Sequence, residues 1–207
     1  MGYETSFSGK FKLDKLLSAA HKAYLVKFND TRRMKRNEQI TAARPDPIRE
    51  AVGLPVGKEG GYFVGAVGHV GQEDEDGQLF SSNERYISLG IIDYNREPEG
   101  QHGLWCPWVP TEDGKGIHIP EENKHYSYIE WLGYIIEHFL TPWGYNLSGK
   151  VRWKGEDSKD RGFICVSNNK VFVNEEPTAL DKIVDAVSGK TKTRVARKSG
   201  IQPGRET

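Results

Sequence analysis

All five tryptophans of this chain lie in one block between Trp105 and Trp153. The block reads LWCPWVP at 104–110 and YSYIEWLGYIIEHFLTPWGYNLSGKVRW at 126–153, while the rest of the chain is Gly-rich, charged or basic. Aromatic side chains bury more apolar area than any others when a chain folds. The hydrophobic core must therefore form around this block, and we expect Trp105, Trp131 and Trp153 to belong to it.

Hydrophobic periodicity predicts a helix over about 125–141. One face of this helix is apolar and consists of Ile129, Leu132, Ile136, Phe139 and Leu140. Ser127 and Glu130 have the spacing of a capping box, and Pro142 with Gly144 ends the helix. A second helix is predicted after Ser18, a plausible N-cap, because Tyr24, Leu25 and Phe28 follow at helical spacing.

Alternating apolar residues predict strands on both sides of these helices. The segments are 5–13 (with Gly9 as a possible bulge), a hairpin of 103–110 with 116–119, then 150–154, 163–166 and 171–173. Asn168-Asn169 suits a tight hairpin turn because asparagine tolerates positive φ. This order predicts an α+β fold: a ferredoxin-like antiparallel sheet with two helices on one face, a long insertion after the first helix, and a C-terminal helix plus basic tail.

The domain organisation follows from the same reading. Residues 1–187 are expected to form a single α+β domain, in which 44–102 is an insertion and 177–187 a short helix. The insertion holds one possible helical turn at 48–52 and one possible strand within 88–95. Residues 188–207 are basic, lack an apolar period, and are predicted to be a disordered tail.

Composition narrows the class of protein. The chain carries 29 basic and 29 acidic residues, and zero net charge argues against a coat protein for nucleic acid or a membrane-surface protein. No apolar run approaches membrane-spanning length, and the N-terminus lacks a secretory signal, so we expect a cytoplasmic protein with no membrane partner. Cys106 and Cys165 lie in apolar runs and are expected to be buried free thiols.

No catalytic or metal-binding motif is present. The histidines form no H-x-x-x-H or H-E-x-x-H pair, C-x-x-C and G-x-S-x-G are absent, and the Gly-rich stretch matches no phosphate-binding loop. We therefore expect no metal and no cofactor, and the sequence favours a non-enzymatic module. One alternative is an enzyme whose site lies between the insertion and the 125–140 helix, using Glu130 or His138.

The leading functional prediction is an interaction module that binds a protein partner. Trp108, Trp143 and Tyr145 fall near the ends of predicted elements, where any of them left exposed would anchor an interface. Tyr62 and Phe63 of the Gly-rich insertion complete the predicted partner-binding surface. The aromatic residues lack the basic and aromatic strand pattern of a base-stacking sheet, so core packing is the favoured role for most of them.

Nucleic-acid binding is the second functional alternative. Its candidate residues are cations in two segments, namely Arg32, Arg33, Lys35 and Arg36 after the first helix, and Lys190, Lys192, Arg194, Arg197 and Lys198 in the tail. Such cations would contribute a phosphate interaction that weakens with salt. A solvated helix end and a solubilising tail explain the same residues without a partner.

Four strings resemble segments of uncharacterised proteins found in bacteria and phages. They are TRRMKR (31–36), REAVGLPVG (49–57), GLWCPWVPTEDG (103–114) and HFLTPWGYNLSGKVRWKGED (138–157), and the resemblance covers about residues 5–173. That group has no assigned activity, so the resemblance implies a bacterial or phage cytosolic setting and carries no functional residue over.

Overall fold

The structure, a computed structural model, describes residues 4–37, 39, 47–54, 91–93, 95–120, 126–157 and 159–175. Tyr62, Phe63, most of the insertion, the predicted 177–187 helix and the tail lie outside these residues. The elements are β1 (Thr5–Leu13), α1 (Ala19–Asp30), β2 (Lys35–Arg36), α3 (Pro47–Glu50), β3 (Ile91–Asp93), β4 (Val109–Pro110), β5 (Gly116–His118), α5 (Tyr128–Ile135), the π-helical turn η1 (Ile136–Leu140), β6 (Leu147–Gly155), β7 (Arg161–Ser167) and β8 (Lys170–Glu175).

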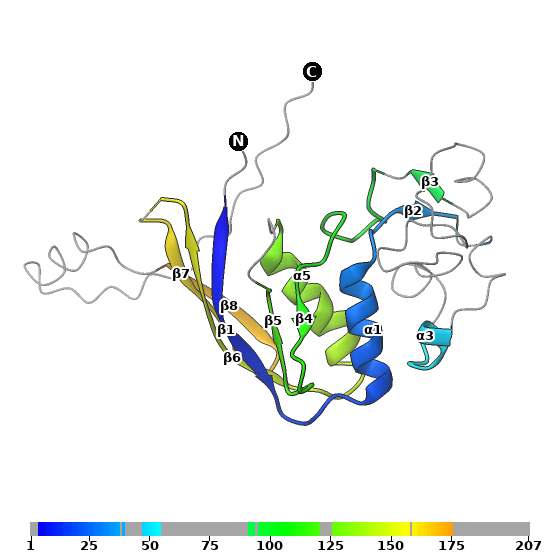
Figure 1. Cartoon of the computed structure of the whole chain (residues 1–207), viewed down its shortest axis with the longest axis horizontal. Coiled ribbons are helices and arrows are strands. Elements are labelled where there is room, and N and C mark those ends of the chain that lie inside the picture. Colours follow the sequence, from blue (N-terminus) through cyan, green and yellow to red (C-terminus); the bar gives the residue numbers. More distant parts are fainter. Residues whose placement is uncertain are drawn as a thin grey trace, which may run out of the picture.

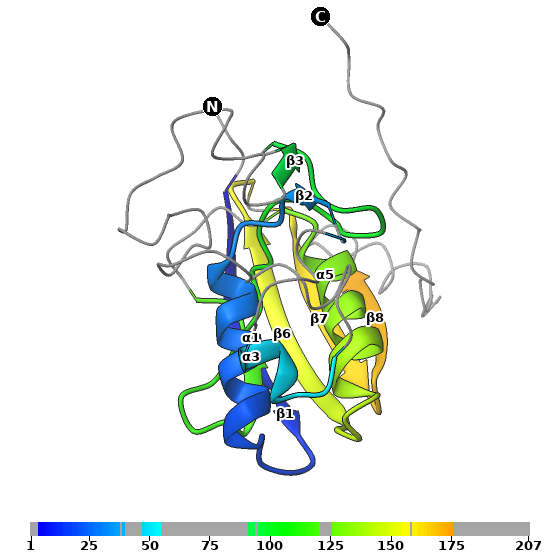
Figure 2. The same cartoon turned by 90° about the vertical axis from the view of Figure 1, so that its right-hand side faces the viewer.

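The fold is α+β, with a six-stranded antiparallel sheet in the order β4-β5-β1-β6-β7-β8. The helices α1 and α5 lie side by side on one face of this sheet (Figures 1 and 2). Strands β2 and β3 form a separate two-stranded sheet beyond the end of α1. The short α3 packs on the outer side of α1. One broad sheet face is thus covered by helices.

The covered face of the sheet holds the core. Phe7 and Phe11 of β1 and Val151 and Trp153 of β6 are buried, and they alternate with exposed neighbours. Their partners from the helices are buried as well, namely Tyr24, Leu25, Phe28, Trp131, Leu132, Ile135, Phe139 and Leu140. Ring contacts such as Phe7 with Tyr128 and Tyr24 with Phe139 join the elements. Burying rings of this size stabilises the fold by about 1.5–3 kcal/mol each.

Local signals in the sequence placed several element ends correctly. Ser18 caps α1, since its hydroxyl accepts a hydrogen bond from the backbone N–H of His21. Asn168 and Asn169 both have positive φ (47° and 64°) in the turn between β7 and β8. The Pro142–Gly144 segment follows the last helical residue, and Gly144 has φ 74°.

Other local predictions were wrong or only partly correct. Ser127 has φ 50° and caps nothing with its side chain, so the capping box is not formed. The predicted central helix continues from α5 into a π-helical turn that no sequence signal indicated. Gly9 has φ 100°, yet β1 pairs with β6 without a register shift, so there is no bulge at Gly9. Trp105, expected in the core, is 40% exposed because only Val109–Pro110 of its segment joins the sheet.

Candidate functional site

Two of the predicted partner-binding aromatics are buried. Trp108 is 1% exposed; its indole N–H donates to the Tyr128 carbonyl oxygen (2.6 Å), and its ring lies 5.5 Å from that of Phe11. Tyr145 is 4% exposed, and its hydroxyl accepts a hydrogen bond from Ser18 N–H (3.1 Å). These side chains connect the elements of the core. The exposure that an interface anchor requires is absent at both positions.

Trp143 is half-buried in a small polar and aromatic cluster. The His21 ring stacks on Trp143 at 4.1 Å between centroids, and His21 Nδ1 lies 2.9 Å from the Tyr145 hydroxyl oxygen. The Lys15 ammonium lies 4.9 Å from the centroid of the Tyr145 ring. Burial lowers the pKa of His21, and the charge of Lys15 acts in the same direction. The cluster therefore favours a neutral imidazole that binds the tyrosine hydroxyl.

The predicted basic site after α1 is not a continuous exposed patch. Arg33 is buried, with its guanidinium 4.2 Å from the centroid of the Phe28 ring, and Arg36 is also buried. Arg32 donates to the Asn95 side-chain oxygen (2.9 Å) and lies 6.0 Å from the Trp105 ring centroid. Lys35 is exposed. Because Arg33 and Arg36 are buried, their side chains pack within the fold and do not form an exposed binding surface. The predicted tail cations lie outside the described residues.

Glu130 and His138 show no acid–base arrangement among the described residues. Glu130 is exposed, while the His138 ring stacks on that of Tyr134 at 4.2 Å. The insertion that was predicted to close over them is described only at 47–54, 91–93 and 95–102. A shallow hollow occurs elsewhere, between α1 and α3, and is lined by Ala19, Lys22, Ala23, Val26, Lys27, Asp30 and Ile48. Its lining offers no set of groups for catalysis.

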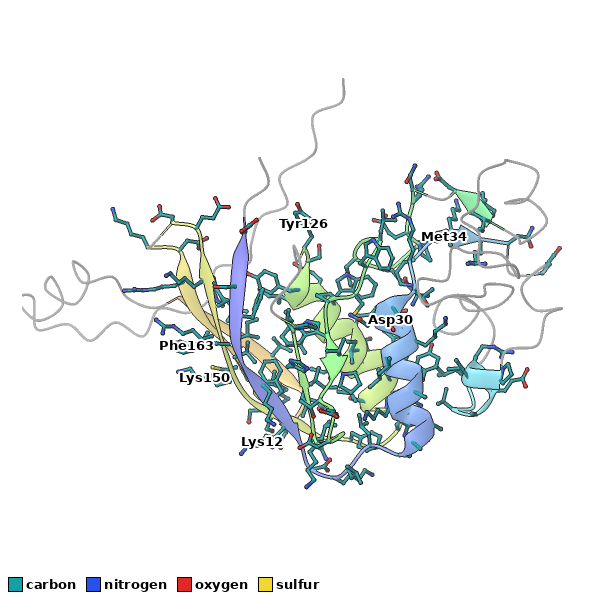
Figure 3. All side chains as sticks on the ribbon, in the orientation of Figure 1. Lys12, Asp30, Met34, Tyr126, Lys150 and Phe163 are labelled. Atoms are coloured by element: carbon teal, nitrogen blue, oxygen red, sulfur yellow. The ribbon has the colours of Figure 1, made fainter. Side chains whose placement is uncertain are left out.

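The most distinctive surface of the described chain is the sheet face that the helices leave uncovered, which we call the open face. Figure 3 shows Lys12, Lys150 and Phe163 on the side of the sheet away from the helices. Alternation along β1, β6, β7 and β8 places further side chains there. The basic ones are Lys10, Lys12, Lys150, Arg152, Lys154, Arg161 and Lys170. The others are Ser6, Ser8, Ser148, Phe163, Cys165, Ser167 and Phe172.

Strand register brings these cations together. Lys10 lies directly opposite Lys150, and Lys154 lies directly opposite Arg161. Like charges at such positions destabilise a sheet, whereas opposite charges would stabilise it by about 0.2–1 kcal/mol. A surface that serves solubility alone usually mixes both signs of charge. The concentration of one sign of charge at these positions therefore distinguishes this face from an ordinary soluble surface.

Carboxylates border the open face at its two ends. No described side chain that projects from the strands onto this face is an Asp or Glu. Glu4 and Glu156 lie at one end, where Glu156 accepts a hydrogen bond from Glu4 N–H (2.9 Å). Asp113 lies in the β4–β5 turn, where hydrogen bonds from Thr111 and Lys115 lower the pKa of its carboxyl, with a smaller contribution from Lys10. Among the described strand residues, the charged side chains in the middle of the face are thus all basic.

Two aromatic rings interrupt the cations. Phe172 is 51% exposed, and Phe163 is half-buried with the Lys150 ammonium 3.2 Å from its ring centroid. An exposed cation–π contact contributes about 0.5–1 kcal/mol. Stacking of a nucleic-acid base on an aromatic ring contributes about 1–3 kcal/mol. The two rings are thus the large apolar side chains of a face that is otherwise polar and basic.

In KVRWK (150–154), alternation with the apolar Val151 and Trp153 places Lys150, Arg152 and Lys154 together on the outward face of the strand. What sequence reasoning missed is that Lys10 and Lys12 lie beside them, since this needs the pairing of β1 with β6.

No metal-binding group of His, Cys, Asp and Glu occurs within the described segments. The same part of the chain contains no helix long and apolar enough to cross a bilayer. Comparisons with protein-family models, with curated proteins and with solved structures find no match for this chain. The open face is therefore the feature of the described chain from which a function can be inferred.

Proposed function

We propose that the chain binds nucleic acid through the open face of its sheet. The observation that carries this proposal is the position of Lys10 directly opposite Lys150, among other basic side chains, on a face whose described strand residues include no carboxylate at its centre. Phosphate groups spaced along a nucleic-acid strand would relieve the repulsion between these cations and release condensed counterions. The zero net charge of the whole chain does not oppose this, because the cations are concentrated locally.

The order of the strands supports the same site. The strands β1 and β4, which α1 connects, are separated by β5, which is the defining feature of a split β-α-β unit. We propose that β1, α1, β4, β5, α5 and β6 form a ferredoxin-like unit, extended at the β6 edge by β7 and β8. The helices then cover one face, and the extension enlarges the face that remains open.

We also propose that the protein is cytosolic and comes from a bacterium or a phage. Cys106 and Cys165 are both free thiols, which suits a reducing cytosol. The resemblance of four sequence strings to uncharacterised bacterial and phage proteins supports a bacterial or phage origin.

The test is a salt series with a mixed-sequence oligonucleotide and three matched triple variants of the full chain. The face variant is K10Q/K150Q/K154Q, the helix-layer control is K15Q/K22Q/K27Q, and the tail variant is K190Q/K192Q/K198Q. Each variant removes the same number of lysines. We expect the face variant to bind at least about tenfold more weakly between about 50 and 200 mM salt and to have a log–log salt slope shallower by about 2.

Each result of this series has a defined meaning. Wild-type binding with a loss confined to the face variant supports the proposal. Equal losses in the face and helix-layer variants would show that binding follows total charge and would reject the open face. A loss confined to the tail variant would move the site to the predicted tail.

Binding of a protein partner remains a second candidate because of one observation. Trp105 is 40% exposed, and the Arg32 guanidinium lies 6.0 Å from its ring centroid. Tryptophan and arginine are the residue types most enriched at interface hot spots. Pull-down with wild-type protein and with Trp105→Ala tests this candidate, and identical sets of captured proteins would reject it.

A further inference from the structure

The two phenylalanines of the open face carry an inference about the kind of nucleic acid bound. Phe172 is 51% exposed, and it shares the open face with the half-buried Phe163, so two aromatic rings lie among the cations. We propose that the open face binds single-stranded nucleic acid, with one base stacked on Phe172 and a neighbouring base stacked on Phe163. This inference rests on the proposed function and adds base contacts to its phosphate contacts.

Strand register places the two rings as neighbours. Phe172 lies directly opposite Cys165, which is two residues after Phe163 on the same face of β7. The rings are therefore on diagonal positions of adjacent strands, whose separation is about 7–8 Å. Adjacent nucleotides of an extended strand are spaced on a similar scale, so each ring can hold one base.

The cations lie on both sides of this aromatic pair. In register, Lys10, Lys150, Cys165 and Phe172 form one row across the sheet, and Arg152 lies directly opposite Phe163. Lys170 lies opposite Ser167, two residues before Phe172 on β8. A strand whose bases lie on the rings therefore has lysines and arginines within reach of its phosphates.

Lys150 connects the two kinds of contact. Its ammonium lies 3.2 Å from the Phe163 ring centroid and covers that ring in the free protein. A base that stacks on Phe163 takes this place, and the released ammonium can then pair with a phosphate. Lys150 thus shields an apolar ring without ligand and binds the backbone with ligand.

Single strands present the groups that this surface requires. In a duplex the base faces stack on one another and cannot reach a side-chain ring, whereas an unpaired strand offers both faces of each base. Stacking is tolerant of base identity, so no sequence preference is needed.

The experiment measures the affinity of the full chain for probes of equal phosphate number. They are oligo-dT and oligo-U of about 15 nucleotides, an abasic DNA strand of that length, and a duplex. Anionic phosphatidylserine vesicles serve as a base-free polyanionic surface. The variants are F172L and F163L, which keep an apolar side chain but remove the flat ring, and F172A, which tolerates truncation because the ring is exposed. Circular dichroism and thermal melting establish that each variant is folded.

We expect wild type to bind oligo-dT or oligo-U roughly tenfold or more tightly than the abasic strand. F172L should reduce affinity for the base-containing strands roughly fivefold or more and leave the abasic strand unaffected. F163L should act in the same direction. The ratio of oligo-U to oligo-dT affinity tells RNA from DNA, and either preference is consistent with stacking.

Several results would overturn the inference. Equal affinity for oligo-dT, the abasic strand and the duplex would leave nucleic-acid binding intact but eliminate base stacking. Stronger binding to the duplex would do the same. Absence of binding to every oligonucleotide would overturn both the proposed function and this inference. Binding to the vesicles alone would reassign the face to an anionic lipid surface.

Discussion

The two faces of the central sheet are made from alternate residues of the same strands, and they differ completely in chemistry. On the covered face, Phe11 and Val151 pack into an aromatic core beneath α1 and α5. On the open face, Lys10 and Lys150 lie opposite each other in solvent. Core packing constrains the covered residues closely. The composition of the open face is free of that constraint, so it is the better indicator of function.

Reactivity of the two cysteines gives the largest expected difference between regions. Cys106 is buried, and burial raises the pKa of its thiol to about 12, against smaller opposing effects of its contacts with Trp108 and Arg33. Cys165 is half-buried on the open face. We expect a thiol reagent to modify Cys165 rapidly. It should modify Cys106 at least about a thousandfold more slowly, because Cys106 reacts only after the core opens.

This prediction is checked by following thiol modification with and without denaturant. Both thiols should react quickly once the chain is unfolded. Addition of oligo-dT to the native protein should slow modification of Cys165. Equal rapid reaction of both thiols in the native state would contradict the assignment of Cys106 to the core.

Removing one ring from each face should separate stability from binding. Phe11→Ala removes a fully buried ring and should lower the free energy of unfolding by about 3–5 kcal/mol. Phe172→Ala on the open face should change it by no more than about 0.5 kcal/mol. Urea denaturation measures both. Similar losses for the two variants would mean that Phe172 is a structural residue.

Relieving charge repulsion on the open face should give a smaller effect of opposite sign. Lys10→Gln removes the cation opposite Lys150 and should raise the free energy of unfolding by a few tenths of a kcal/mol, at most about 1 kcal/mol. The gain should shrink as salt screens the pair. Oligonucleotide affinity should fall in the same variant. A loss of stability at low salt would refute the view that the cations repel one another.

The smallest expected effect is a pH dependence of stability that arises from His21, at the edge of the covered face. The pKa of His21 is lowered in the fold, by burial first and by Lys15 second. Just below pH 6.5, the ordinary pKa of a histidine, the unfolded chain therefore binds more protons than the folded chain. Stability from this group is fully present above 6.5 and declines as the pH falls below it.

His21→Gln should therefore flatten stability between pH 6.5 and the lowered pKa of His21. Thermal melting across this range measures the effect. Tyr145→Phe removes the hydroxyl that lies 2.9 Å from His21 Nδ1 and provides a second variant. A wild-type protein with no slope in this range would contradict the neutral, tyrosine-bound histidine.

Much of the fold follows from local patterns. The strand 5–13 and the cap at Ser18 were predicted correctly because alternation and capping depend on residues close in sequence. The exposure of Trp105 and the burial of Arg33 were not predicted. Both depend on how the segments after α1 and before β4 pack. Residue type alone favours the opposite placements, since tryptophan is usually buried and arginine exposed.

The candidate site could be predicted only in fragments. Alternation in KVRWK indicates that Lys150, Arg152 and Lys154 share a face, and nothing in that segment indicates what lies beside them. For the same reason, the sequence does not show that Phe163 and Phe172 are neighbours, since they belong to separate predicted strands. Their position next to Lys150 and Cys165 follows from the antiparallel pairing of β6, β7 and β8.

By itself, the sequence determined where the core lies, that the chain is α+β, and which side chains alternate along each strand. These properties arise from burial of aromatic residues and from the two-residue repeat of a strand. Only the tertiary structure decided that Lys10 lies opposite Lys150, that Phe163 and Phe172 are neighbours, and that α1 and α5 both lie on the other face of the sheet. Strand pairing and layer packing join residues far apart in the chain, and no local pattern specifies such contacts.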